Sequence, residues 1–130
     1  MKSPRIETFK ILRNACDVEL KGLVTKSNIH TIDIPESEIK EDNLTLVRIN
    51  SMRNNPDDFA SNNPLTYEQM VAIYVWDTDS DKLDQIAQII EELMECNDWV
   101  LYRNFDVAED TEADGWYMLH HRYRTTKLNM

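Results

Sequence analysis

The fold of this chain is decided by residues 66–99, which read TYEQMVAIYVWDTDSDKLDQIAQIIEELMECNDW. Residues 70–76 are a short apolar run rich in β-branched and aromatic side chains. Such a run predicts a strand that is buried on both faces or nearly so. The polar cluster at 77–80 ends the run, and the spacing of apolar residues changes after it.

The segment after the polar cluster has the pattern of an amphipathic helix. Asp79 or Ser80 can cap its free N–H groups, and Asp81 and Asp84 suit its positive end. Its apolar positions recur at spacings of three and four, as on one face of an α-helix: Leu83, Ile86, Ala87, Ile90, Leu93 and Met94. We therefore expect this face to pack against the sheet that contains residues 70–76.

Another amphipathic helix and two strands are predicted upstream. A proline suited to a first helical turn opens residues 4–23, where apolar spacing predicts a helix of about five turns. Residues 29–35 and 44–50 read as short strands. Segment 51–64 is rich in Asn, Asp and Pro and predicts a long loop. Phe59 in this loop either anchors it to its own domain or contacts a neighbouring subunit.

A hairpin is predicted downstream. Residues 99–103 and 116–124 read as strands, and the acidic segment 106–114 between them reads as an exposed turn. Alternation in the last strand divides its side chains between two faces, with Trp116, Met118 and His120 on one and Tyr117, Leu119, His121 and Tyr123 on the other.

These elements predict one α+β domain over residues 1–130. Their order is helix, three strands, helix, two strands. We expect a mainly antiparallel sheet of about five strands with both helices packed on one face.

The composition indicates a cytosolic protein. No apolar run is long enough to span a bilayer, and no basic-then-apolar leader opens the chain, so no membrane association is expected. Cys16 and Cys96 are isolated and occupy apolar helix positions, which predicts two buried free thiols.

The net charge of −10 is unevenly distributed. Residues 77–114 hold thirteen acids against Lys82 and Arg103, whereas residues 1–26 and 120–127 are basic. Two interpretations stay open: a solvated acidic helix face, or a subunit whose acidic and basic faces contact copies or partners.

We find no pattern typical of an enzyme. His120 and His121 would point to opposite faces of a strand and could not share a metal ion. With only two glycines a phosphate-binding loop is excluded, and the sequence indicates no cofactor. The helix carboxylates Asp84, Glu91, Glu92 and Glu95 lie mostly off the apolar face, as expected for a solvated surface. Sequence-specific nucleic-acid binding is not expected from this charge.

The layout resembles a family of tail components of long-tailed bacteriophages and of prophages in Gram-positive bacteria, similar to tail terminator or tail completion proteins. The resemblance depends on element order and on the segments VWDTDSDKLDQIAQIIEEL at 75–93 and GWYMLHHRYR at 115–124. It implies a non-enzymatic subunit of a hexameric ring that caps the tail tube and meets the head–tail connector. The location implied is the host cytoplasm during assembly and then the virion tail.

Candidate interface residues come from the residues themselves and not from the family: Phe59, Asp110, Glu112, Trp116, Tyr117, Arg122 and Arg124. In a straight hairpin the two arginines lie more than about 20 Å from the acidic tip, at about 3.3 Å per residue. We therefore expect them to meet acids of another copy. The alternative is a monomeric acidic adaptor or regulator that binds a basic partner.

Overall fold

The computed structural model describes residues 3–32, 45–60, 63–111 and 115–128, with the backbone alone described for 53–60, 63–67 and 127–128. The elements along the chain are α1 (Pro4–Ala15), the 3₁₀ turn η1 (Lys26–Asn28), β1 (Ile29–Thr31), β2 (Leu46–Ala60), β3 (Asn63–Asp77), α3 (Ser80–Cys96), β4 (Val100–Glu109) and β5 (Tyr117–Leu128). Within these described residues, the predicted chain order of helix, three strands, helix and two strands is confirmed.

The five strands form one mixed sheet in the order β1-β2-β3-β5-β4. The α+β class is confirmed, and the sheet is mainly antiparallel because only the β1–β2 pair is parallel. Strand order in space differs from strand order in the chain. Because β5 is antiparallel to both β3 and β4, those two strands run in the same direction, and α3 is the crossover that connects them.

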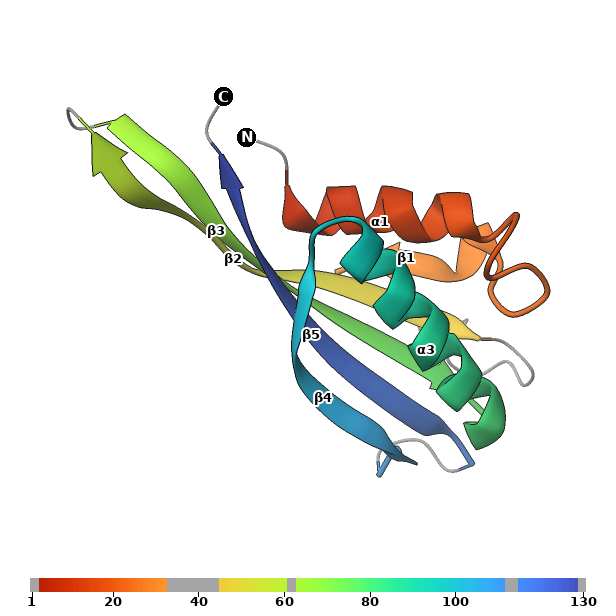
Figure 1. Ribbon diagram of the computed structural model, residues 1–130. Helices are drawn as coiled ribbons and strands as arrows, with labels where there is room; N and C mark the ends of the chain where they lie inside the picture. The colour runs from red at the N-terminus through yellow and green to blue at the C-terminus, as the bar shows by residue number, and fades with distance from the viewer. Residues whose placement is uncertain (1–2, 33–44, 61–62, 112–114, 129–130) are drawn as a thin grey trace.

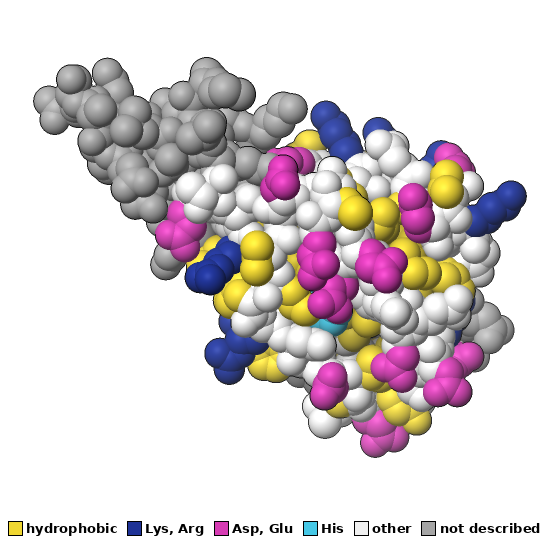
Figure 2. Space-filling model, in the orientation of Figure 1, with side chains coloured by type: hydrophobic (Ala, Val, Ile, Leu, Met, Phe, Trp, Pro, Cys, Tyr) yellow, Lys and Arg dark blue, Asp and Glu magenta, His cyan; other side chains and the backbone are white. Residues whose placement is uncertain are grey.

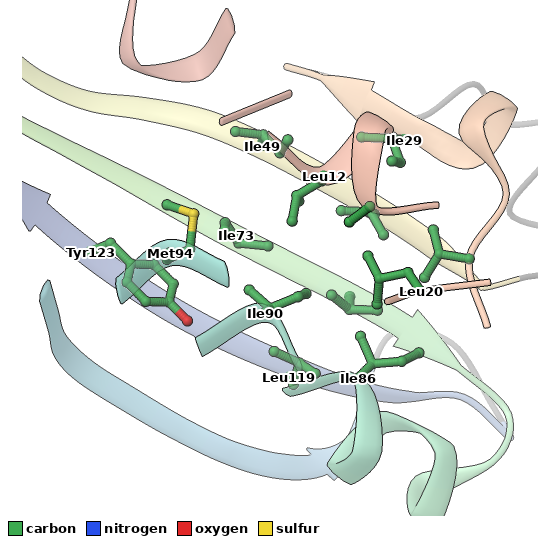
Figure 3. Close-up of a cluster of buried hydrophobic side chains, with 14 of the residues drawn as sticks. Leu12, Leu20, Ile29, Ile49, Ile73, Ile86, Ile90, Met94, Leu119 and Tyr123 are labelled. Atoms are coloured by element: carbon green, nitrogen blue, oxygen red, sulfur yellow. The ribbon is translucent and has the colours of Figure 1, made fainter. Parts of the chain in front are cut away.

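Both helices cover the same face of the sheet (Figure 1). A single core forms between the two layers, with Leu12 of α1, Ile90 of α3 and Ile73 of β3 at its centre (Figure 3). The predicted apolar face of α3 is confirmed at its fully buried positions, Leu83, Ile86, Ile90 and Met94. Every second residue of the strands points into this core, including Val47, Ile49, Val71, Val75, Leu119 and Tyr123.

A set of contacts around one carboxylate, called the Asp77 cluster here, fixes the turn between β3 and α3. The buried Asp77 carboxylate accepts hydrogen bonds from the Thr45 hydroxyl and from the Asp79 backbone N–H, and it lies 3.4 Å from the Lys82 ammonium. The Asp79 side chain accepts from the backbone N–H groups of Asp81 and Lys82 and is therefore the helix cap. Of the two predicted capping residues, the structure selects Asp79.

The predicted loop at 51–64 is wrong, because β2 and β3 continue through it as an antiparallel arm, along whose base β5 also pairs with β3 as far as Thr66↔Leu128. The arm, defined as residues 53–60 and 63–70, remains paired from Arg53↔Met70 to Ala60↔Asn63 and projects beyond the helices (Figure 1). A register shift lies at its base, between Ser51 and Arg53. The sequence here lacks the alternation of a half-buried strand, and backbone pairing with β3 supplies the order instead.

Phe59 belongs to this arm and pairs in register with Pro64, but its side chain lies outside the described residues. Its predicted role as an anchor remains a prediction.

The N-terminal helix is shorter than predicted. It ends at Ala15, and the chain turns so that the Leu20 N–H bonds the Ala15 carbonyl and Gly22 adopts a φ of +79°. Leu20 and Val24 are nevertheless buried in the core. The apolar spacing therefore marks buried residues correctly here, although the backbone is no longer helical. The next strand also ends early, since Ile32 has a φ of 90° and lies beyond β1.

The acidic segment after β4 is shorter than predicted, because 106–109 belong to that strand. An edge strand tolerates carboxylates that point to solvent. The acids among residues 106–109 therefore made this part of the sequence resemble a turn, although Phe105 and Val107 belong to a strand. The β4–β5 hairpin itself is confirmed. Cys16 is buried as predicted, whereas Cys96 is exposed because it is the last residue of α3.

Candidate interaction surface

The face of the sheet opposite the helices, called the open face here, carries an unusual row of side chains. Strand register places Arg48, Tyr74, His120 and Phe105 side by side on β2, β3, β5 and β4. No described helix covers this row. The alternation that sends Ile49, Ile73 and Tyr123 to the core sends these four to the other face.

The aromatic rings of the row are stacked on one another. The ring centroids of Tyr74 and His120 are 4.1 Å apart, and those of His120 and Phe105 are 4.7 Å apart. Trp76 stacks on Tyr74 at 5.8 Å, and its indole N–H donates to the Asp110 carboxylate at 3.0 Å. The rings therefore stand next to each other and use their faces for mutual contact.

Arginines lie against this stack. The Arg48 guanidinium is 4.3 Å from the Tyr74 ring centroid and 5.2 Å from that of Trp76. Arg103 and Arg122 both lie 5.2 Å from the Phe105 centroid. Cation–π contacts of this kind are worth about 0.5–2 kcal/mol each and restrict the orientation of the guanidinium.

His120 is neutral within this basic row. It is 8% exposed, and its burial together with Arg122, His121 and Arg48 lowers its pKa from 6.5 to about 4. The Arg122 Nε–H donates to His120 Nε2 at 3.3 Å, which requires an unprotonated Nε2. The positive charge of the open face at neutral pH therefore comes from arginines.

Charge is divided between the two sides of the molecule. The open face carries Arg48, Arg103, Arg122 and Arg124, and none of the four forms a salt bridge within the described part of the chain. Two described acids share this face: Asp110, which accepts from Trp76, and Glu68, which the β3 register places on the same side as Tyr74. The helix side carries acids over its surface, with basic side chains mainly at its margins (Figure 2). On α3 the exposed acids are Asp81, Asp84, Glu92 and Glu95.

A second polar feature lies beneath α3. His121 is buried, and its Nδ1 is 2.9 Å from the Tyr123 hydroxyl. Burial lowers the His121 pKa, although Asp106 opposes the shift, and burial followed by Glu91 and Glu95 raises the pKa of Tyr123. A cavity of about 200 Å³ between α3 and β4 reaches His121. This pair satisfies two buried polar groups and is best explained as a structural hydrogen bond.

The sequence-predicted interface residues are only partly brought together. Arg122 and Arg124 both lie on the open face. The Asp110 carboxylate accepts a hydrogen bond from the indole N–H of Trp76 on the same face. Trp116 is buried, and Tyr117 packs against the core on the helix side. Phe59 and Glu112 cannot be placed with them, because neither side chain lies within the described residues.

Sequence reasoning missed Arg48, Tyr74, Arg103 and Phe105. Alternation along 46–50 and 70–76 could have assigned the first two to one face. Strand order was needed to place Phe105 beside His120. The prediction that His120 and His121 lie on opposite faces is confirmed.

No family model and no curated protein matches this sequence.

Within the described ranges, acids, histidines and cysteines nowhere gather in a group of three that could hold a metal ion. The same residues include no helix with both the length and the apolar character needed to cross a membrane. The open face combines stacked aromatic rings with arginines that form no salt bridge within the described residues, and guanidinium groups of this kind suit the recognition of anionic groups.

Proposed function

We propose that this chain is a structural subunit of a phage-type tail, a tail terminator or completion protein that assembles into a ring, with a hexamer as the expected size. In this role it caps the tail tube and joins it to the head–tail connector. It acts by binding and not by catalysis. Assembly takes place in the host cytoplasm, and the finished ring belongs to the virion tail.

The observation that carries the proposal is the division of charge between the open face and the helix side. A ring requires heterologous contacts, in which one surface of each subunit meets a different surface of the next. A basic sheet face and an acidic helix face on one chain supply two such surfaces. The resemblance in element order agrees with this role, and the projecting arm offers a further point of contact with tail partners.

Solution mass tests the proposal. Light scattering coupled to size exclusion, over a range of protein concentrations and with the tail tube protein added, should report one closed oligomer. Negative-stain images should show rings at the end of tail tubes. A monomer under all these conditions would reject the ring and favour the acidic adaptor.

A further inference from the structure

We infer that the open face of one subunit receives the acidic surface of α3 from a second copy of the chain. The contact pairs Arg48, Arg103, Arg122 and Arg124 with the exposed carboxylates of α3. The inference deepens the proposed function, since it rests on ring assembly and names the two surfaces that make the ring contact.

The guanidinium groups of the open face are prepared for carboxylates. Arg48 lies against Tyr74 and Trp76, and Arg103 and Arg122 lie against Phe105, so their side chains are already oriented. Planar guanidinium groups bind carboxylates through paired N–H donors. The described chain supplies these arginines with no salt bridge. Apart from the Nε–H of Arg122, which bonds His120, and the buried Nε–H of Arg48, their N–H donors can therefore serve a partner.

The α3 surface fits this face in charge and in length. Its only basic residue, Lys82, is already paired with Asp77. Asp84 and Glu95 are eleven positions apart, or about 16 Å at about 1.5 Å per helical residue. Arg48 and Arg124 are two strands and four positions apart, or about 16 Å at about 4.8 Å per strand and about 3.3 Å per residue.

Nucleic acid fits the open face less well than α3 does. Proteins that bind single-stranded nucleic acid stack the bases on free faces of aromatic rings. Here the ring faces of Tyr74, His120 and Phe105 are occupied by contacts with each other and with arginines. The net charge of −10 also opposes the approach of a polyanion. A second copy presents its charge as a short acidic helix.

This contact is heterologous, so every subunit offers both halves of it. Repeating it closes a ring when the rotation between neighbours is a whole fraction of a turn, and a ring is the assembly that the proposed function requires.

Charge reversal on each side tests the contact. One variant, Arg103→Glu with Arg124→Glu, reverses two exposed arginines of the open face. The other, Glu92→Lys with Glu95→Lys, reverses two exposed acids of α3. Each variant alone should assemble at least tenfold more weakly than the parent. An equal mixture should restore the ring, because each interface then joins opposite charges, and so should a chain carrying all four changes.

The matched control is Asp17→Lys with Lys26→Asp, which exchanges the two members of an exposed ion pair that belongs to neither α3 nor the open face and should leave assembly unchanged. Thermal melting confirms that each variant is folded, and Arg103→Gln with Arg124→Gln replaces the first variant if it is not. Restoration by mixing cannot arise from misfolding.

Three outcomes overturn the inference. If the parent forms a ring and both reversal variants do too, the proposed function stands and the contact lies elsewhere. If the parent is monomeric even with tail tube protein, both the proposed function and this contact fail. If duplex or single-stranded DNA binds the parent and loses affinity in the open-face variant while the ring persists, the occupant is nucleic acid.

Discussion

His120 and His121 are adjacent in β5, yet the pleat places them in different surroundings. His120 lies among arginines and aromatic rings on the open face, and His121 bonds Tyr123 beneath α3. Both are held neutral mainly by burial. For His120 the neutral state matters most, because protonation would add a cation between Arg48 and Arg122.

The first prediction concerns the pH dependence of His120. Its pKa is lowered to about 4 in the folded protein, so the contribution of its neutral form is complete above the unfolded pKa of about 6.5 and declines as pH falls toward 4. Relative to His120→Phe, which keeps a ring in the stack, the parent should lose about 1–3 kcal/mol of unfolding free energy over this interval.

Urea unfolding of both proteins at a series of pH values measures this difference. His121 and the carboxylates are common to both proteins, so their titration cancels in the comparison. Parallel stability curves for parent and variant would show that His120 is not the titrating group.

At the scale of elements, α3 combines two functions on opposite sides of one helix. Its apolar side fills the core through Leu83, Ile86, Ile90 and Met94, and its carboxylates face solvent. The β3–α3 turn fixes its start through Asp77 and Asp79. Errors in the position of this helix would therefore affect the core and the acidic surface together.

The second prediction tests the buried side of α3. Ile90 is 0% exposed, so Ile90→Asp places an unpaired charge in the core and should unfold the domain or destabilise it by about 4 kcal/mol or more. Gln88→Asp introduces the same charge on the exposed side of the same helix and should change the unfolding free energy by about 0.5 kcal/mol or less. Circular dichroism melting distinguishes them, and equal melting temperatures would mean that the core is wrongly assigned.

The third prediction tests the Asp77 cluster. Asp77→Ala leaves the Thr45 hydroxyl and the Asp79 N–H without their acceptor and should cost about 2–4 kcal/mol. Asp81→Ala, on the exposed first turn of α3, should cost at most about 1 kcal/mol through the helix dipole. Denaturant unfolding of both variants gives the comparison, and equal losses would remove the special role of Asp77.

At the scale of the whole molecule, two features extend past the packed core: the arm and the open face. The arm lengthens the sheet beyond the helices, and the open face places arginines on the side of the sheet opposite α3. A chain of this shape can contact neighbours on two sides. In the proposed ring, assembly should therefore depend on charge in a way that a symmetric face-to-face dimer would not.

The fourth prediction concerns salt. Screening length falls from about 10 Å at 0.1 M to about 3 Å at 1 M, and exposed ion pairs are worth only about 0–1 kcal/mol each. If arginine–carboxylate pairs make the ring contact, its dissociation constant should rise at least tenfold over this range. Arg122→Glu with Arg124→Glu should weaken the ring at 0.1 M salt, and added salt should then no longer weaken it further, because the screened charges at these positions now repel. Assembly that is indifferent to salt would instead indicate apolar contacts, for which Val100 and Phe105 are the exposed candidates.

The sequence by itself determined the local structure wherever burial imposes a period. A short apolar run located residues 70–76 of β3, the three–four spacing located the start and buried face of α3, and alternation divided β5 into two faces. Local polarity also limited the cap to Asp79 or Ser80, and the structure selects Asp79. These features are recoverable because each depends on neighbours within one or two turns of chain.

Only the tertiary structure decided the arm, the strand order and the open face. The arm is held by backbone pairing, which leaves no hydrophobic period in 51–64. β5 lies between β3 and β4 because α3 carries the chain across to the far edge of the sheet before β4 begins. The order of the elements in the sequence does not reveal this arrangement. Arg48, Tyr74, His120 and Phe105 come from four strands and become neighbours only through inter-strand hydrogen bonding, a long-range interaction that no local pattern encodes.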